Sequence, residues 1–200
     1  MSGAHLSSPI KPKTKHGRSK ETNKITDYFP VRRSTRKTEK MIKLEQIMEL
    51  KRKIYTGENE FDLIVESFED KGRGVRAARA FEKGEFVIEY KGERIPHRTA
   101  LIREAKYAED PQIGSYMYFF NYRNARWCID ATEESIYKGR LINHSFFLPN
   151  LQTKVVDFGG DDFFLCLFAS RYIKANEELL YDYGERNEKR VELNPWLMAS

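Results

Sequence analysis

The chain has 200 residues, of which 40% are apolar, and a formal net charge of +5 at pH 7. This length suits one domain of ordinary size with a flexible extension. The sequence has neither the roughly 18 consecutive apolar residues of a membrane span nor an apolar stretch near Met1 typical of a secretory signal, so we expect no membrane association.

The charge is unevenly divided along the chain. Residues 1–53 carry 15 Lys and Arg against 5 Asp and Glu, a net charge of +10, and residues 54–200 carry 20 against 25, a net charge of −5. A basic segment of this kind attracts nucleic acid or an acidic partner, although selection for solubility alone would also explain it. The acidic remainder favours a basic ligand.

The N-terminal residues 1–36 are rich in Lys, Ser, Thr and Pro and poor in apolar residues. They cannot bury enough surface to offset the entropy of ordering, so we predict a disordered basic tail. Residues 37–57 are predicted to form a flanking helix packed on the following domain, with Thr38 as N-cap and Gly57 as stop. The apolar residues at helical spacing are Met41, Leu44, Ile47, Met48 and Ile54.

After Gly57 the sequence is typical of short β-strands, because aromatic and β-branched residues gather in short runs bounded by Gly, Asp or Asn. Helices are predicted only at residues 98–108 and 133–142. The fold class is therefore mainly β with short helices, arranged as several small sheets. The predicted strands are Phe61–Val65, Phe86–Tyr90, Tyr116–Phe120, Trp127–Ile129, Thr153–Val156 and Phe163–Phe168.

The two cysteines, Cys128 and Cys166, lie in apolar predicted strands. Two residues cannot form a disulfide framework or a cysteine-rich zinc site. We expect buried, reduced thiols.

Three short segments combine glycines or the end of an apolar run with polar groups that can perform chemistry. In Lys71-Gly72-Arg73-Gly74-Val75, two glycines around one residue let the backbone approach a ligand closely, although most such segments are ordinary turns. The spacing matches neither a dinucleotide-binding motif nor a P-loop.

The second segment, Gly139 to Ser145, ends in Asn143-His144-Ser145. A lone histidine after an apolar run is more often structural than catalytic. No cysteine or carboxylate at ligand spacing accompanies it, so we expect no metal site. There is also no Gly-x-Ser-x-Gly elbow of a hydrolase.

The third segment, Glu177 to Gly184, ends in Tyr181-Asp182-Tyr183-Gly184. Taken alone, it is a strand whose tyrosines pack in the core. Taken together and in this order, the three segments resemble the signature of the SET-domain protein lysine methyltransferases.

This resemblance implies a SET domain over residues 58–186, with a C-terminal segment threaded through a surrounding loop as a pseudoknot, and a post-SET helix at residues 187–200. It also implies S-adenosyl-L-methionine as the cofactor. The residues implied to bind the cofactor are Lys71, Gly72, Arg73, Tyr116, Asn143, His144 and Trp196.

The same resemblance implies that Tyr183 is the active-site tyrosine, that Tyr90 lines the lysine channel, and that Glu185 lies in the substrate groove. A lysine amine must be neutral to attack a methyl group, and neutralising it at pH 7 costs about 4.6 kcal/mol in water. An aromatic channel lowers this cost by desolvation and aligns the amine. At position 181 the family sets the number of methyl groups with Tyr or Phe, and Tyr181 implies monomethylation.

The ending Asn194-Pro195-Trp196-Leu197 resembles the branch of the family that monomethylates lysine-20 of histone H4. Glu185 and Asn194 depart from the pattern of this branch, as does the apolar loop at residues 146–151. We expect monomethylation of this histone lysine, with two alternatives left open: a module that binds cofactor or histone with poor turnover, and a methyltransferase for a non-histone lysine.

A further motif lies in the predicted tail at residues 22–33, where Ile25 is followed by Tyr28, Phe29 and basic residues. It resembles the motif that binds the sliding clamp PCNA as a short helical turn, in the variant linked to ubiquitin-dependent destruction. Thr22 stands where this motif usually has Gln, and a chance aromatic pair is the alternative. We expect a monomer in the nucleus, on the chromosome, with the histone H4 tail in nucleosomes and DNA among its partners.

Overall fold

The computed structural model describes residues 37–69, 71–110, 112–114 and 116–183. The chain divides into two units, Met1–Thr38 and Glu39–Ser200, and the fold described below is that of the second unit. Several predictions lie outside the described residues: the tail at residues 1–36, the post-SET helix at residues 187–200, and the site residues Ile25, Tyr28, Phe29, Glu185 and Trp196.

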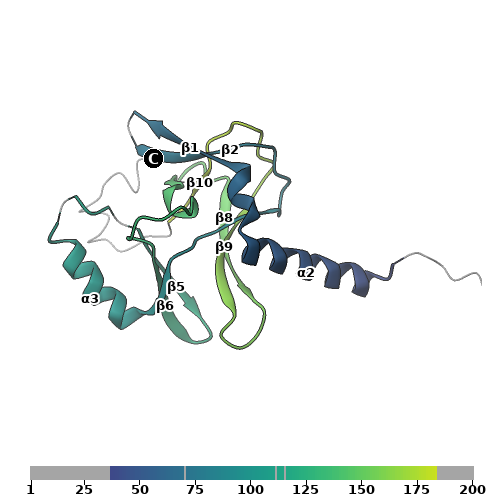
Figure 1. Cartoon of the computed structure of the whole chain (residues 1–200), viewed down its shortest axis with the longest axis horizontal. Helices are drawn as coiled ribbons and strands as arrows, with labels where there is room; N and C mark the ends of the chain where they lie inside the picture. The colour runs from purple at the N-terminus through teal and green to yellow at the C-terminus, as the bar shows by residue number, and fades with distance from the viewer. Residues whose placement is uncertain (1–36, 70, 111, 115, 184–200) are drawn as a thin grey trace, which may run out of the picture. The chain divides into compact units, whose positions relative to one another are not determined.

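Short strands dominate the described part of the chain, as the sequence predicted (Figure 1). The helical elements are α2 (Glu39–Thr56), η1 (Glu58–Asp62), α3 (His97–Tyr107) and η2 (Gly139–Leu141). The strands are β1 (Leu63–Phe68), β2 (Gly72–Ala77), β3 (Phe86–Glu89), β4 (Glu93–Pro96), β5 (Met117–Tyr122), β6 (Ala125–Asp130), β7 (Asn143–His144), β8 (Leu151–Asp157), β9 (Phe163–Ala169) and β10 (Leu180–Tyr181).

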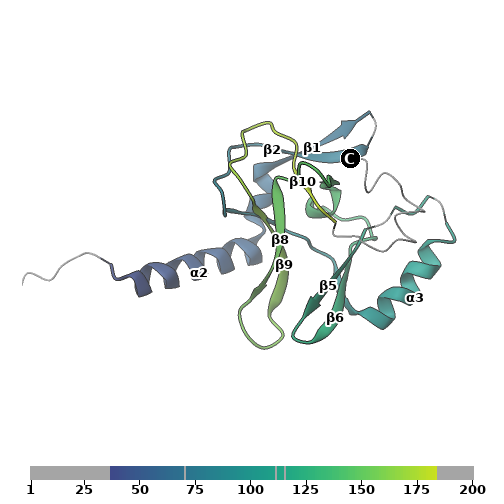
Figure 2. The same ribbon diagram turned by 180° about the vertical axis from the view of Figure 1, so that it is seen from behind.

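In the described residues these strands form three small sheets. A two-stranded sheet joins β1 and β2, a three-stranded sheet has the order β4-β6-β5, and a five-stranded sheet has the order β3-β9-β8-β10-β7. The β5–β6 and β8–β9 hairpins run side by side in both views (Figures 1 and 2). Their ends are joined by the Tyr122 and Phe163 rings, whose centroids are 4.9 Å apart.

The C-terminal strand β10 is inserted into the five-stranded sheet between β7 and β8. It pairs in parallel with both neighbours, since Tyr181 lies opposite His144 on one side and opposite Leu151 on the other. A segment near residue 180 thus passes between two strands formed about 30 to 40 residues earlier. This is the threaded arrangement that the resemblance implied.

The side chains of β5 alternate between two hydrophobic clusters, one on each face of the strand. Tyr116, just before β5, and Tyr118 and Phe120 pack against the main core, whereas Met117 and Phe119 pack against the cluster of Ile95, Ala100 and Cys128. Successive side chains of a strand point to opposite faces, so one strand serves both surfaces. The cluster beneath Met117 includes Ala100, which anchors α3.

The helix α2 forms as predicted but packs on the domain only through its C-terminal end. Ile54 is buried against Phe86, Cys166 and Phe168, with Leu50 at the margin. Gly57 ends the helix in the left-handed region, at φ 65°, and donates its backbone N–H to the Lys53 carbonyl at 3.0 Å. The predicted packing on the domain is therefore limited to the C-terminal end, because Met41, Leu44, Ile47 and Met48 are each more than half exposed.

Two local predictions were wrong. Phe61 and Asp62 belong to η1 and not to a strand, which begins at Leu63. The helix expected at residues 133–142 is reduced to the single turn of η2. Distant partners hold the preceding segment, since Lys138 donates to Glu60 and to the Leu63 carbonyl. The Gly139 backbone also lies against Glu89, where an added Cβ would be 2.4 Å from the Glu89 carbonyl oxygen.

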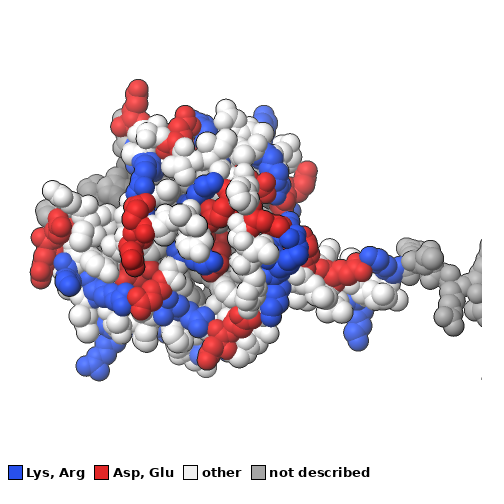
Figure 3. All heavy atoms as spheres, in the orientation of Figure 1, with Lys and Arg blue, Asp and Glu red and all other residues white. Residues whose placement is uncertain are grey.

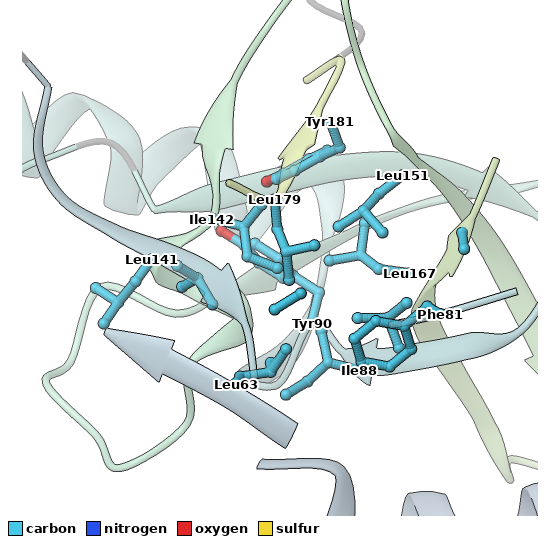
Figure 4. Packing of buried hydrophobic residues seen from close by; sticks show 14 of the residues in the cluster. Leu63, Phe81, Ile88, Tyr90, Leu141, Ile142, Leu151, Leu167, Leu179 and Tyr181 are labelled. Atoms are coloured by element: carbon cyan, nitrogen blue, oxygen red, sulfur yellow. The ribbon is translucent and has the colours of Figure 1, made fainter. Parts of the chain in front are cut away.

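The main core gathers residues from all three sheets (Figure 4). Cys128 and Cys166 are both buried free thiols, as expected. On the face seen in Figure 3, basic and acidic side chains lie interspersed. In the described ranges, no helix is both long and apolar enough to cross a membrane.

Candidate active site

The insertion of β10 brings the second and third sequence motifs into contact. The Ser145 backbone N–H donates to the Tyr181 carbonyl at 3.1 Å, and the Tyr183 backbone N–H donates to Nδ1 of His144 at 3.1 Å. Asn150 holds the other side of the segment, since its side chain donates to the Glu178 carbonyl and accepts from the Leu180 N–H. Two motifs almost 40 residues apart therefore form one wall.

Four tyrosines converge beside this wall, and we call Tyr90, Tyr118, Tyr181 and Tyr183 the aromatic cluster. The Tyr181 ring centroid lies 6.4 Å from that of Tyr90, 6.0 Å from that of Tyr118 and 4.6 Å from that of Tyr183. In Figure 4 the hydroxyl groups of Tyr90 and Tyr181 point toward each other. Tyr118 comes from β5 and Tyr181 from β10, while Tyr90 follows β3 and Tyr183 follows β10. Their rings gather several hydroxyl groups in one small region.

The Tyr183 hydroxyl has a fixed direction. It donates a hydrogen bond to the Ile142 carbonyl at 3.0 Å, and its ring packs 4.8 Å from that of His144. The proton of the hydroxyl is therefore engaged with a backbone carbonyl, and a hydroxyl oxygen is also a hydrogen-bond acceptor. Tyr183 faces the segment of Asn143 and His144, as the proposed site requires.

Burial keeps the hydroxyls of the aromatic cluster protonated. Desolvation raises the pKa of Tyr181 well above its ordinary value, with further contributions from Tyr90, Tyr183 and Tyr118. The pKa values of Tyr90, Tyr118 and Tyr183 are also raised, in each case mainly by desolvation. A charged amine entering the same region would be desolvated too, which favours its neutral form.

The glycine-bearing turn lies beside Asn143. A Cβ added to Gly74 would be 2.4 Å from Nδ2 of Asn143 and 2.6 Å from the Phe68 ring, so only glycine permits this approach. Gly72 has φ 71°, and nothing lies within 4 Å of its Cβ position. Glu178 joins the two segments, because it accepts from Asn143 at 3.3 Å and pairs with Lys71 at 3.5 Å.

Arg73, Glu134 and Arg140 form a second connection, which we call the arginine–glutamate link. Arg73 donates two hydrogen bonds to Glu134, of 2.9 and 3.0 Å, and Arg140 donates one of 2.8 Å. The Arg140 guanidinium lies over the Tyr116 ring at 3.8 Å. The Tyr116 carbonyl in turn accepts the Tyr90 hydroxyl at 3.1 Å, so the link reaches the aromatic cluster.

The structure thus brings together most of the site residues predicted within its described ranges. Those around the aromatic cluster are Tyr90, Tyr116, Asn143, His144, Tyr181 and Tyr183. Lys71, Gly72 and Arg73 lie at the adjoining turn.

Three residues at the site were missed by sequence reasoning: Tyr118, Glu134 and Arg140. Tyr118 was recognisable, because it lies two positions after Tyr116 in a predicted strand and so shares its face. The partners of Glu134 and Arg140 could not be read from spacing, since Glu134 and Arg73 are 61 positions apart. Among the described residues, no group of three or more His, Cys, Asp or Glu side chains could hold a metal ion.

Comparison with known proteins gives an independent assignment. Residues 72–184 match the SET domain family. The chain is 50% identical to the histone-lysine N-methyltransferase set-1 of Caenorhabditis elegans over 178 residues, covering 88% of this chain and 72% of that protein. It is 46% identical to the N-lysine methyltransferase KMT5A-A of Danio rerio over 180 residues, covering 90% of this chain and 52% of that protein.

A solved structure, CpSET8 from Cryptosporidium, superposes with a TM-score of 0.58 at 41% identity, covering 62% of this chain and 58% of that one. The chain spans most of the worm relative but about half of the zebrafish relative and of the CpSET8 chain. The threaded strand, the converging tyrosines and the family match agree. The chain belongs to the SET-domain family of protein lysine methyltransferases.

Proposed function

We propose that this protein is a histone-lysine N-methyltransferase that transfers one methyl group from S-adenosyl-L-methionine to a lysine of a basic histone tail, namely lysine-20 of histone H4. The observation that carries the proposal is the aromatic cluster, in which a fixed Tyr183 hydroxyl lies beside the buried hydroxyls of Tyr181 and Tyr90. Aromatic rings and neutral hydroxyl groups in this arrangement suit a neutral amine.

The first task of the site is to bind the lysine in its neutral form. In water this form costs about 4.6 kcal/mol at pH 7. The rings of Tyr90, Tyr118 and Tyr181 replace water around the amine and lower its pKa by desolvation. None of these hydroxyls is ionised near neutral pH, because their pKa values are raised, so they offer no counter-charge that would retain the ammonium form.

The second task is to orient the amine. The Tyr183 oxygen donates its proton to the Ile142 carbonyl, so its lone pairs accept an N–H of the amine and direct the nitrogen lone pair. Methyl transfer needs chiefly this alignment, which makes it positioning catalysis. The amine proton that is lost on entry leaves to solvent before the transfer.

The residues of the glycine-bearing turn suit the cofactor. The space at Gly72, the amide of Asn143 and the guanidinium of Arg73 together provide an open backbone, a hydrogen-bonding side chain and a cation for an amino-acid group. We assign Lys71, Gly72, Arg73, Tyr116, Asn143 and His144 to its binding, with Trp196 at its adenine. When bound, S-adenosyl-L-methionine supplies the electrophilic methyl group.

The choice of substrate rests on the relatives and on charge. The worm relative is named a histone-lysine N-methyltransferase. Residues 54–200 carry a net charge of −5, which suits a peptide of Arg, His and Lys, with Glu185 in the groove that receives it. Tyr181 is buried, with 3% of its surface exposed. Its hydroxyl would retain a water in the space that a methylated amine needs, which supports monomethylation.

The same proposal places the protein in the nucleus, on the chromosome, as a monomer. The basic residues 1–53 would contact DNA phosphates in the nucleosome. Ile25, Tyr28 and Phe29 would bind PCNA and couple the protein to ubiquitin-ligase machinery.

Mass spectrometry of nucleosomes incubated with the protein and S-adenosyl-L-methionine tests the proposal. We expect one added methyl group on lysine-20 of histone H4, and none on nucleosomes that carry Arg at that position. Transfer to another lysine would show that lysine-20 of histone H4 is not the substrate, and a second methyl group would refute monomethylation. Cofactor binding by calorimetry with no transfer to any nucleosomal lysine would favour a binding module.

A further inference from the structure

Glu134 connects two arginines of very different environments. Arg73 lies at the start of β2 with 45% of its side chain exposed, whereas the Arg140 side chain, in η2, is 2% exposed. The Glu134 carboxylate accepts two hydrogen bonds from the first and one from the second. One carboxylate thus bonds both the exposed and the buried arginine.

The buried arginine has few other ways to balance its charge. Nε of Arg140 donates to the Ala131 carbonyl at 2.6 Å, and another nitrogen donates to the Thr132 carbonyl at 3.3 Å. Glu134 is its only carboxylate partner among the described residues. Hydrogen bonds from Arg73 and then from Arg140 lower the pKa of Glu134 to about 2, so the carboxylate stays charged at neutral pH.

The position of Arg140 matters for the lysine channel. Its guanidinium is stacked on the Tyr116 ring at 3.8 Å. The Tyr116 carbonyl accepts the Tyr90 hydroxyl at 3.1 Å and the Ala131 N–H at 3.0 Å. A shift of Arg140 would thus move the residue that orients Tyr90 in the aromatic cluster.

We propose that Glu134 is a positioning residue that couples cofactor binding at the turn of Lys71, Gly72 and Arg73 to the shape of the lysine channel at Tyr116 and Tyr90. The inference rests on the proposed function. When Arg73 engages the carboxylate of the cofactor, it shares its guanidinium between two anions. Glu134 then bonds more fully to Arg140, which holds Tyr116 and Tyr90 in the arrangement that accepts the amine. Linkage makes the effect reciprocal, so each ligand tightens the binding of the other.

Calorimetry of the full chain tests this coupling. The affinity for S-adenosylhomocysteine is measured with and without a saturating histone H4 peptide that contains lysine-20. We expect the peptide to tighten binding about tenfold in the wild type and by less than about twofold in Glu134→Gln. Glu133→Gln, which removes an exposed neighbouring carboxylate, should keep the wild-type coupling.

A second variant protects the test against misfolding. Arg73→Ala changes an exposed side chain, and we expect it to reduce the coupling to the same extent, with no further loss when it is combined with Glu134→Gln. The proposal is overturned if the wild type shows no coupling, or if Glu134→Gln lowers only the unfolding midpoint and keeps the coupling. Failure of the proposed function is a separate result, namely no methyl transfer by the wild type.

Discussion

At the scale of single residues, the tyrosines of the aromatic cluster differ from one another in what their hydroxyls contact. The Tyr183 hydroxyl is bound to a backbone carbonyl, that of Tyr118 to the Thr153 hydroxyl at 2.8 Å, and that of Tyr181 faces Tyr90. Because these environments differ, removing each oxygen should have a different effect. The phenylalanine variants keep the rings and therefore the packing.

Tyr183→Phe should reduce methyl transfer by about 100-fold, because the amine loses the oxygen that directs its lone pair. Binding of S-adenosyl-L-methionine should change little, since the ring against His144 remains. Single-turnover transfer and calorimetry measure the two effects. Tyr122→Phe, which removes a hydroxyl bonded to Asp157 at a hairpin end, is the matched control, and equal activity of the two variants would contradict the assigned role.

Tyr181→Phe should allow a second methyl group to be added. The variant removes an oxygen that is buried between Tyr90 and Tyr118, and the vacated space can hold a methylated amine. Mass spectrometry of a histone H4 peptide after prolonged incubation should show dimethyl-lysine with the variant and monomethyl-lysine with the wild type. A purely monomethylated product from the variant would count against this residue as the determinant.

Glu89 should make the free energy of unfolding depend on pH between about pH 4.5 and 7. Desolvation raises its pKa to about 7, Lys91 lowers it and Glu60 raises it further. Folding therefore favours the protonated form of Glu89. The stability that this group contributes is fully present below about pH 4.5 and is lost as the pH rises through about 7.

Glu89→Gln should raise the free energy of unfolding at pH 8 by on the order of 2–3 kcal/mol and flatten its change between pH 5 and pH 7. Urea unfolding at several pH values measures this effect. Glu82→Gln, which alters an exposed glutamate before β3, should follow the wild type. An unchanged pH profile in Glu89→Gln would show that other groups govern this window.

At the scale of elements, a buried side chain adds to the backbone pairing that holds β10 between β7 and β8. Asn150 donates to the Glu178 carbonyl at 2.7 Å and accepts from the Leu180 N–H at 2.8 Å, and 1% of its surface is exposed. A two-residue strand has few ladder hydrogen bonds of its own. The position of Tyr181 on β10 thus depends in part on the hydrogen bonds that Asn150 makes to the preceding residues.

Asn150→Ala should lower the free energy of unfolding by about 3 kcal/mol, because it leaves buried backbone groups of Glu178 and Leu180 without partners. Chemical denaturation measures the loss. Asn121→Ala, at an exposed position of β5, should stay within about 0.5 kcal/mol of the wild type. A similar loss in the two variants would mean that Asn150 has no special part in holding β10.

The regular elements could be predicted because their signals are local. The aromatic run of β9 buries nearly all of its side chains, whereas α3 buries Ala100 alone among its residues and was recognisable from its position before Pro111. The irregular segment at residues 131–138 could not be predicted, because distant partners hold it: Lys138 contacts Glu60 and Leu63, and Glu134 contacts Arg73. For α2, spacing identified the helix but could not reveal that only its last turns meet the domain.

The site also has a part that local sequence signals identify and a part that depends on distant contacts. Tyr181, Tyr183, Asn143 and His144 could be identified because each pair lies in one short motif. The proximity of these motifs to Tyr90 depends on the insertion of β10, which the family resemblance implied and residue spacing did not.

At the scale of the whole molecule, charge is unevenly divided along the chain. Residues 1–36 contain 9 Lys and Arg against 2 Asp and Glu, whereas residues 54–200 are net acidic. Phosphate contacts made by a basic segment weaken steeply with salt, because binding releases counterions from DNA. The basic segment should therefore affect binding to nucleosomes more than the chemistry.

Removal of residues 1–36 should leave the methylation rate of a short histone H4 peptide within about twofold of the intact chain. For nucleosomes, the truncated chain should bind more weakly and with a smaller dependence of affinity on salt. Binding titrations between 50 and about 200 mM salt measure the slope. An unchanged slope would place the DNA contacts elsewhere in the chain.

The position of β10 also has a consequence for synthesis. Leu180 and Tyr181 leave the ribosome about 30 to 40 residues after the strands between which they insert. Until then β7 and β8 have no partner between them, and the aromatic cluster lacks Tyr181 and Tyr183. The nascent chain can therefore complete its five-stranded sheet only after residues 180 and 181 have left the ribosome, and a product that stops before them lacks both β10 and two tyrosines of the aromatic cluster.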